Sequence, residues 1–358
     1  MSAILGIETS CDETSVAVVR DDGSVLSNII ASQIETHRPF GGVVPEIASR
    51  EHLRKLLPLI TQALDESALM LSDLDAIAVT AGPGLIGALL VGVAGAQGIC
   101  YGRNIPIIPV NHLEGHLYSA YLRRKGPSVA VPDHFLSIVV SGGHSSIYDV
   151  RDGAVEILNR TRDDAAGEVF DKVAKFIGLP YPGGPHVEEI GKEGDPEAFY
   201  FPLPQFKDDS IDFSFSGLKS NAIRVARSEA ISADGDRARL ADFCASFQRA
   251  ICDQIADRLT RAWEALENRP AEICLTGGVA ANGALRDRIQ SWSDQRSLTV
   301  RIPEKVFCTD NGAMIAFCGW QAYGRGETAD PKRVSALSRV QVGHRNLFSP
   351  SSSQLQNA

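Results

Sequence analysis

Paired cysteines are absent from this sequence. It contains seven cysteines, but none lies in a CxxC pair of the kind that metal-binding and redox motifs use. The first ten residues, MSAILGIETS, are too short and polar for a signal peptide and predict a strand instead. We therefore expect reduced, buried thiols in a cytoplasmic protein.

Positive charge is also in short supply. The chain has 35 Lys and Arg residues against 44 Asp and Glu residues, which gives a formal net charge of −9. A protein that binds nucleic acid by itself is usually basic, so binding of RNA would require a local patch or a partner protein. The clearest basic run is Arg123, Arg124 and Lys125, which is either such a patch or an ordinary solvated surface.

The sequence lacks an apolar run long enough to cross a membrane. Its most apolar stretch, Gly84 to Cys100, is rich in Gly and Ala and is shorter than the roughly 20 residues that a transmembrane helix needs. This stretch predicts a buried helix, and we expect no membrane association.

The zinc-protease motif HExxH is missing as well. In NHLEGH, Glu114 follows His112 by two residues, which places it about 200 degrees around a helix from that histidine. Glu114 would therefore point away from an ion that the histidines hold. This spacing argues against a metalloprotease mechanism.

What the sequence does contain is a repeated hairpin pattern. Ile4 to Ile7 lead through ETSCDETS to a second apolar run, and Leu136 to Val140 lead through SGGHSS to another. Backbone N–H groups in such turns can form an anion site. Because the pattern occurs twice, and because 358 residues exceed the usual size of one core, we predict two similar α/β lobes.

A histidine pair suggests metal chemistry. His112 and His116 are one helical turn apart, so both imidazoles can reach one metal ion. Asp310, in FCTDNGAMIA, could complete a site of two histidines and one carboxylate with open coordination positions. Alternatively, Asp310 caps the helix that begins there, although Asn311 could serve as the cap instead.

Two glycine turns follow predicted strands and favour anion binding. In SGGH, Gly142 and Gly143 allow backbone amides to approach an anion closely. In TGGVAAN, two glycines separate a strand from a helix, where a nucleotide can lie near the helix N-terminus, and Asn282 either contacts the ligand or caps the helix. Neither turn fits Walker A or GxGxxG, which disfavours P-loop and Rossmann sites.

Carboxylates gather in the first hairpin turn. ETSCDET holds Glu8, Asp12 and Glu13, and carboxylates this close are usually kept near a metal, a base or water. The plainer interpretation is a solvated hairpin tip. Further along, Asp171 either pairs with Lys175 on a helix surface or faces a cleft.

Together and in this order, the motifs point to one family. The chain resembles, over nearly its whole length, the TsaD family of tRNA threonylcarbamoyladenosine transferases, whose archaeal and eukaryotic relative works in the KEOPS complex. The resemblance rests on GIETSCDETSVAVV, AGPGLIGALLVG, NHLEGH, VSGGHS, DDAAGEVFDKVAK, YPGGP, FSFSGLK, LTGGVAAN and CTDNGAMIA.

The resemblance implies the ASKHA fold of actin, Hsp70 and sugar kinases, in which two duplicated lobes surround a nucleotide cleft. On this basis we place the N-terminal lobe at 1–132, completed by roughly 309–345, and the C-terminal lobe at 133–308. The Ser/Gln-rich end at 349–358 is expected to be a flexible tail.

The resemblance also implies a reaction and its cofactor. The L-threonylcarbamoyl group would pass from threonylcarbamoyl-AMP to N6 of adenosine 37 in tRNAs that read ANN codons, giving t6A and AMP. One divalent metal per subunit, Fe²⁺ or Zn²⁺, would be held by His112, His116 and Asp310. An adenine nucleotide (threonylcarbamoyl-AMP, AMP or ATP) would bind in the cleft. Asp12 and Glu13 are our candidates for accepting the amine proton.

The implied substrate contacts lie around the second hairpin and the later glycine turns. At position 188 this chain has Glu where some members have Asp, so that contact departs from the family pattern. The full set is Val139, Val140, Ser141, Gly142, Gly143, Asp171, Gly184, Glu188 and Asn282.

The implied partners are tRNA, a TsaB-like paralogue and a TsaE-like ATPase, with threonylcarbamoyl-AMP made by a TsaC-like enzyme. A shared tRNA surface fits an acidic subunit, and the helices near Met70 to Cys100 are the expected heterodimer face. The alternatives are a metal-dependent ATPase or small-molecule kinase of the same fold, a metallopeptidase, and a non-catalytic scaffold. The histidine pair disfavours a kinase, because kinases bind Mg²⁺ through oxygen ligands.

Overall fold

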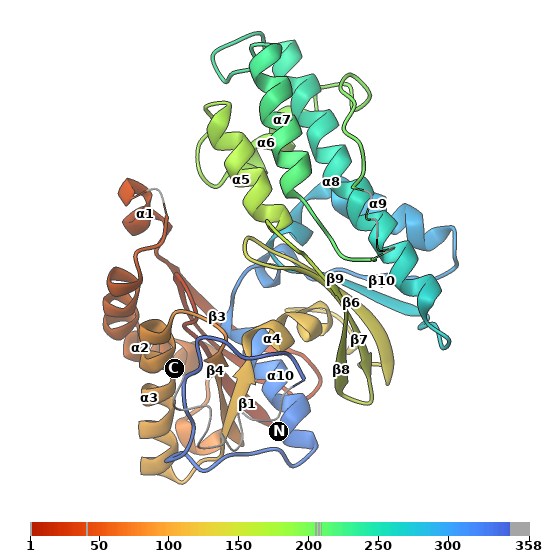
Figure 1. The fold of residues 1–358 in the computed structure, drawn as a ribbon. Coiled ribbons are helices and arrows are strands. Elements are labelled where there is room, and N and C mark those ends of the chain that lie inside the picture. The colour runs from red at the N-terminus through yellow and green to blue at the C-terminus, as the bar shows by residue number, and fades with distance from the viewer. Residues whose placement is uncertain (1, 41, 205, 207, 209, 344–358) are drawn as a thin grey trace. The chain divides into compact units, whose positions relative to one another are not determined.

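The chain forms two compact units. The computed structural model describes residues 2–40, 42–204, 206, 208 and 210–343, so the expected tail at 349–358 and residues 344 and 345 lie outside the described residues. The first unit comprises Met1–Val131 and Thr309–Ala358, and the second comprises Pro132–Cys308 (Figure 1). The first unit is therefore built from both ends of the chain.

A mixed sheet with the strand order β3-β2-β1-β4-β5 forms the centre of the first unit. β1, β2 and β3 pair antiparallel, whereas β4 and β5 continue the sheet in parallel. All residues of β1 and β4 are buried. The strands are β1 (Ala3–Glu8), β2 (Glu13–Arg20), β3 (Val25–Ser32), β4 (Ala76–Gly82) and β5 (Ile107–Asn111).

Alternate residues of β1 face different helices. Leu5 and Ile7 lie in the core that α2 and α3 cover, whereas Gly6 faces α10. A Cβ atom on Gly6 would come within 2.1 Å of the Gly312 carbonyl oxygen, so α10 lies directly on the strand backbone. The helices of this unit are α1 (Ile34–His37), α2 (Pro45–Ser67), α3 (Ile86–Arg103), α4 (His112–Tyr118) and α10 (Gly312–Gly324).

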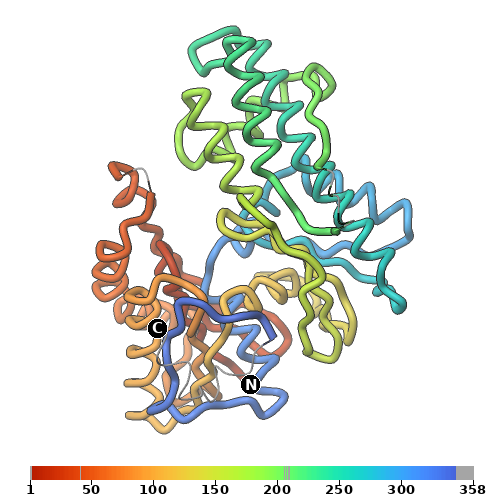
Figure 2. The backbone as a smooth tube through the Cα atoms, viewed as in Figure 1, coloured from red at the N-terminus to blue at the C-terminus, as the bar shows by residue number. Residues whose placement is uncertain are grey.

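After α10 the chain returns along the first unit, as the trace in Figure 2 shows. We call residues 325–343 the C-terminal strap. Leu337 N–H donates to the Ala81 carbonyl over 2.7 Å, and Gly84 N–H donates to the Ser338 carbonyl over 3.3 Å. The strap thus fixes the turn between β4 and α3.

The second unit repeats the strand order of the first. Its sheet has the order β8-β7-β6-β9-β10, with an antiparallel β6-β7-β8 half and a parallel β6-β9-β10 half. This duplication confirms the predicted two-lobed α/β fold. The elements are β6 (His134–Val140), β7 (Ser145–Arg151), β8 (Ala154–Arg160), α5 (Ala166–Phe176), α6 (Gly183–Gly191), α7 (Ser216–Ser228), α8 (Arg237–Ala265), β9 (Glu272–Thr276), α9 (Gly283–Asp294) and β10 (Thr299–Arg301).

α3 differs from the buried helix that its apolar sequence predicts. Among the described helices it is the one that is long and apolar enough to cross a membrane. It packs against α2 and β4 and buries one face, which includes Leu89 and Val93. The side chains of Ile86 and Leu90 on another face are exposed, because nothing else in the described part of the first unit covers them.

Candidate metal centre and active site

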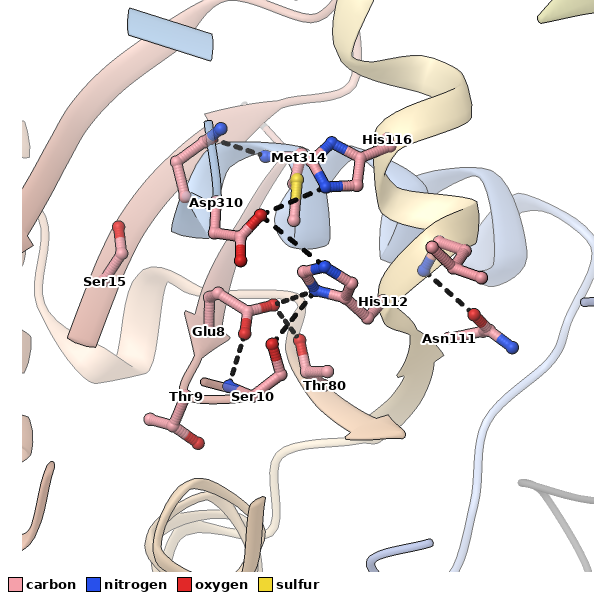
Figure 3. Close-up of polar contacts among 12 residues, drawn as sticks. Glu8, Thr9, Ser10, Ser15, Thr80, Asn111, His112, His116, Asp310 and Met314 are labelled. Atoms are coloured by element: carbon pink, nitrogen blue, oxygen red, sulfur yellow. Dashed lines mark hydrogen bonds and ion pairs between the residues drawn. The ribbon is translucent and has the colours of Figure 1, made fainter. Parts of the chain in front are cut away.

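The histidine pair is positioned by the junction of β5 and α4. Asn111, the last residue of β5, is the N-cap of α4, and its side-chain oxygen accepts a hydrogen bond of 2.9 Å from Leu113 N–H. This cap starts the helix at His112 and places His116 one turn later. The Nε2 atoms of His112 and His116 lie 3.6 and 3.1 Å from Oδ1 of Asp310 (Figure 3).

Asp310 does not cap the helix that follows it. Asn311 is the N-cap of α10, and its side-chain oxygen accepts a hydrogen bond from Met314 N–H over 3.0 Å. Of the two capping residues that the sequence offered, Asn311 therefore takes this role. The carboxylate of Asp310 is left to face the two imidazoles.

These three side chains fit a divalent metal ion. One ligand atom from each of His112, His116 and Asp310 lies within 4.8 Å of the other two. Nδ1 of His112 contacts Glu8 Oε2 at 3.1 Å and Ser10 Oγ at 3.2 Å. A carboxylate behind a ligating histidine is usual in metal sites, because it orients the ring and increases its basicity. Two imidazoles and one carboxylate suit iron or zinc better than Mg²⁺.

Glu8 is a buried carboxylate with a full set of partners. It accepts hydrogen bonds from Thr80 Oγ1 over 2.6 Å and from Ser10 N–H over 2.5 Å. Burial would raise the pKa of Glu8, but the charge of His112 and its hydrogen bond lower it. Burial would likewise lower the pKa of His112, yet the carboxylates of Asp310 and Glu8 raise it to about 9. The centre therefore stabilises positive charge.

The two candidate proton acceptors lie where the turn after β1 meets β2, with Asp12 the last residue of the turn. Glu13 is the first residue of β2, and its Oε1 accepts a hydrogen bond from Ser32 Oγ over 3.1 Å. Burial, followed by the negative charges of Asp12 and Asp310, raises the pKa of Glu13 to about 9. Without a bound cation, Glu13 is therefore protonated near neutral pH.

In the second unit, the SGGH turn follows β6 and closes on itself. Ser141 N–H donates to the His144 carbonyl over 2.8 Å, and His144 N–H donates to Ser141 Oγ over 3.1 Å. Gly142 and Gly143 are exposed, and a Cβ atom at either position would meet only open space. A ligand can therefore approach the backbone of the turn.

Two further glycines bring other elements against this turn. A Cβ atom on Gly167, in the first turn of α5, would lie 2.7 Å from the Ser141 carbonyl oxygen. Gly277, with φ of +89°, would place a Cβ atom 2.4 Å from the Val140 carbonyl oxygen. The start of α5 and the TGGVAAN turn thus pack directly on the end of β6.

The remaining expected substrate residues have structural partners. Asp171 Oδ1 accepts from Gly183 N–H over 2.7 Å, and burial raises its pKa although the amides of Gly183 and Gly184 oppose this. Glu188 Oε1 accepts from Gly283 N–H over 2.9 Å. Asn282 is the N-cap of α9, and its amide also donates to Gln248 Oε1 over 2.7 Å.

Val139 and Val140 lie inside β6 with their side chains fully buried. A ligand at the end of β6 could therefore reach only their main chain. Within this unit the structure brings together the SGGH turn, the TGGVAAN turn and the start of α5. Asp171 lies in α5, and its carboxylate holds the PGGP turn at the start of α6, where Gly184 lies.

Two motifs of the second unit form a structural clamp. Asp163 accepts hydrogen bonds from both Ser214 Oγ and Ser216 Oγ at 2.6 Å, and from the Phe215 and Ser216 amides. Asp164 pairs with Lys219 of the same FSFSGLK segment. DDAAGEVFDK and FSFSGLK therefore hold the starts of α5 and α7 together.

The basic run at 123–125 is not a uniform surface patch. Arg123 is buried, and its Nη2 donates to the Asp22 carbonyl over 2.6 Å and lies 3.0 Å from the Asp22 carboxylate. Its neighbours Arg124 and Lys125 are exposed. Arg123 therefore stabilises the β2–β3 turn and is not available to RNA.

The fold is shared with solved proteins of diverse function. The structure of T. kodakarensis HypF matches 91% of this chain and 48% of its own, with a TM-score of 0.59 and 15% identity. Component A of the Acidaminococcus fermentans (R)-2-hydroxyglutaryl-CoA dehydratase matches 91% of this chain and 100% of its own, with a TM-score of 0.51 and 13% identity. At such low identity these likenesses define the class of fold alone.

Sequence comparison defines the family. The family model of TsaD, tRNA N6-adenosine threonylcarbamoyltransferase, matches residues 24–317. The proteins of that name from Desulfitobacterium hafniense and Moorella thermoacetica are both 48% identical, over 89% and 93% of this chain and 92% and 95% of their own lengths. The Clostridium botulinum protein is 45% identical over 96% of this chain and 98% of its own. The chain belongs to the TsaD family of transferases, as its motifs predicted.

Proposed function

We propose that this protein transfers the L-threonylcarbamoyl group from threonylcarbamoyl-AMP to N6 of adenosine 37 in tRNAs that read ANN codons, in the cytoplasm. The products are t6A and AMP. The observation that carries the proposal is the convergence of His112 Nε2 and His116 Nε2 on Asp310, with Glu8 behind His112. Membership of the TsaD family supports the choice of reaction.

The reaction has two chemical difficulties. N6 of adenine is a weak nucleophile, because its lone pair is delocalised into the ring. The donor is a mixed anhydride whose phosphate must leave as AMP. A divalent metal ion held by His112, His116 and Asp310, Fe²⁺ or Zn²⁺, would supply Lewis acidity toward a phosphate or carbamoyl oxygen.

The chain's own groups would carry the remaining steps. The backbone amides of Gly142 and Gly143 would bind the phosphate of the donor, and alignment of donor and amine would itself contribute about 7 kcal/mol or more. N6 attacks the carbamoyl carbon, the bond from that carbon to the phosphate oxygen breaks, and AMP leaves with the electron pair. The N6 proton passes to Asp12 or Glu13. The raised pKa of Glu13 favours Asp12 as the acceptor.

The test is transfer to unmodified tRNA, with partner proteins and pre-formed threonylcarbamoyl-AMP supplied, comparing wild type with His112→Ala. We expect modification by wild type and its loss in the variant. His134→Ala is the matched control, because His134 Nε2 contacts Asp149 at 2.7 Å within the second unit and His134 is not one of the three expected ligands. No modification by wild type would favour an ATPase or a scaffold, and equal modification by both would make the histidines structural.

We propose further that a TsaB-like paralogue binds to α2 and α3, and that a TsaE-like ATPase and a TsaC-like enzyme serve the same reaction. α2 and α3 pack together and present exposed apolar side chains, with Leu53 at 70% and Leu57 at 63% exposure on α2 and Leu90 at 51% on α3. Exposed apolar patches mark sites of protein association. The combined variant L53D/L57D should fail to bind the purified paralogue in sedimentation, whereas Gln62→Ala on α2 should bind normally.

A further inference from the structure

α2 carries a fully buried histidine, His52, whose two ring nitrogens are both engaged. His52 Nε2 lies 2.9 Å from the Cys11 carbonyl oxygen, and Nδ1 lies 2.8 Å from Thr14 Oγ1. A carbonyl can only accept, so Nε2 carries the proton and Nδ1 accepts from the Thr14 hydroxyl. The ring therefore bridges the two ends of the segment that contains Asp12 and Glu13.

A second set of buried groups holds the same segment. Val44 N–H donates to Nδ1 of His37 over 3.3 Å. Because Nδ1 accepts this bond, the ring proton lies on Nε2, which donates to Gln33 Oε1 over 3.1 Å. The backbone N–H of Gln33 donates to the Asp12 carbonyl over 2.9 Å. The carbonyls of Cys11 and Asp12 are thus held by donors from outside the turn.

The turn has a physical need for such support. Its carboxylates repel one another and Asp310, and this repulsion adds to burial in raising the pKa of Glu13. The corresponding SGGH turn of the second unit carries no carboxylate and closes through its own Ser141 and His144. A buried apolar residue at position 52 would leave the Cys11 carbonyl and the Thr14 hydroxyl unpaired, which is costly.

We propose that His52 is a positioning residue for the transfer reaction: it holds residues 11–14 so that the Asp12 and Glu13 carboxylates stay in place for the amine. The inference rests on the proposed function for its effect on catalysis. It assigns a role to a residue of α2 whose described hydrogen bonds include none to His112, His116 or Asp310.

Three variants separate the hydrogen bonds from the volume of the ring. H52Q keeps an N–H donor long enough to reach the Cys11 carbonyl, H52N reaches only Thr14, and H52F keeps an aromatic ring without polar atoms. Gln62→Ala is the control on the same helix, since Gln62 is exposed and bonds only to Glu66 in the described contacts.

We expect H52F to lower kcat about 100-fold, as a misplacement of about 1 Å does, with unchanged KM for tRNA and unchanged metal content. H52Q should recover most of the lost kcat. Amides of residues 10–14 should exchange hydrogen faster in H52F and at the wild-type rate in H52Q. If H52F fails to fold, H52N takes its place with the same expectation.

A folded H52F or H52N protein with normal kcat would overturn the proposal. The proposal would also be overturned if H52Q and H52F lost kcat equally and hydrogen exchange in the turn stayed unchanged. If wild type itself transfers nothing, the proposed function has failed, and the exchange measurement still decides whether His52 holds the turn. Faster exchange in H52F alone would support that role, and unchanged exchange would refute it.

Discussion

The two sheets share one strand order, but their first hairpins have opposite chemistry. In the first unit the β1–β2 turn is rich in carboxylates and is held from outside by His52 and Gln33. In the second unit the β6–β7 turn contains glycines that open onto solvent and closes on its own Ser141 and His144. The two units thus share the pairing of their strands, while the first hairpin turn gathers carboxylates and the second exposes glycines.

The two turns are also stabilised by different groups. A turn of glycines and a serine satisfies its backbone groups locally and leaves amides free for a ligand. A turn of carboxylates needs buried donors and nearby positive charge, because like charges repel and buried carboxylates without partners are costly. Glu8, with Thr80, Ser10 and His112 around it, is the clearest case.

The largest effect is expected from a change to the candidate metal site of the first unit. Asp310→Asn should remove the anionic ligand, so bound metal measured by elemental analysis should fall well below one ion per chain. Transfer should drop on the order of 100-fold or more, because several kcal/mol of Lewis-acid stabilisation are lost. Asp208→Asn, a change to an exposed carboxylate in the second unit, is the control. Full metal content in Asp310→Asn would remove this residue from the ligand set.

A smaller effect is expected from a change to Glu8, which contacts the candidate ligand His112. Glu8→Gln keeps the size of the side chain but removes the charge that supports His112. Metal affinity in a chelator competition should fall about 10- to 100-fold. Transfer should recover when metal is supplied in excess. Loss of transfer that excess metal cannot restore would instead give Glu8 a part in the chemistry.

Two glycine variants test whether the SGGH turn of the second unit binds the donor. Gly167→Ala forces a Cβ atom against the Ser141 carbonyl, so it should destabilise the protein by about 1–3 kcal/mol and raise KM for the donor.

Gly143→Ala places its Cβ atom in open space, so the free energy of unfolding should change by less than about 0.5 kcal/mol while KM for the donor still rises. An unchanged KM in Gly143→Ala would show that the donor does not approach this backbone.

The smallest expected effect concerns pH and the support of the carboxylate turn. Burial lowers the pKa of His52 below 6.5, and His37 adds to this effect. The hydrogen bond to the Cys11 carbonyl and the charges of Glu8 and Asp12 oppose it, but they do not cancel it. Below pH 6.5 the unfolded state therefore binds a proton that the folded state does not, so stability falls as pH decreases toward the folded pKa. Urea unfolding at pH 7.5 and 5.5 should show a smaller pH-dependent loss in H52Q than in wild type. Equal losses in both proteins would contradict a neutral, buried His52.

Local patterns predicted much of the fold. The apolar runs Ile4 to Ile7 and Leu136 to Val140, predicted as the first strands of the two hairpins, are β1, Ala3–Glu8, and β6, His134–Val140. Helical and strand periodicities are properties of neighbouring residues, so one sequence suffices to find them. The repeat of the strand–turn–strand pattern predicted the duplication for the same reason.

The sequence by itself determined the two-lobed fold, the family and the spacing of His112 and His116, because each depends on residues close together or on motifs in a fixed order. Tertiary structure decided which polar groups meet. The contact of Glu8 with His112 and the bridge from His52 to Cys11 join residues far apart in the chain. It also decided that Asn311 caps α10 while Asp310 does not, and that Arg123 is buried. Such choices depend on how strands and helices pack, which no local pattern specifies.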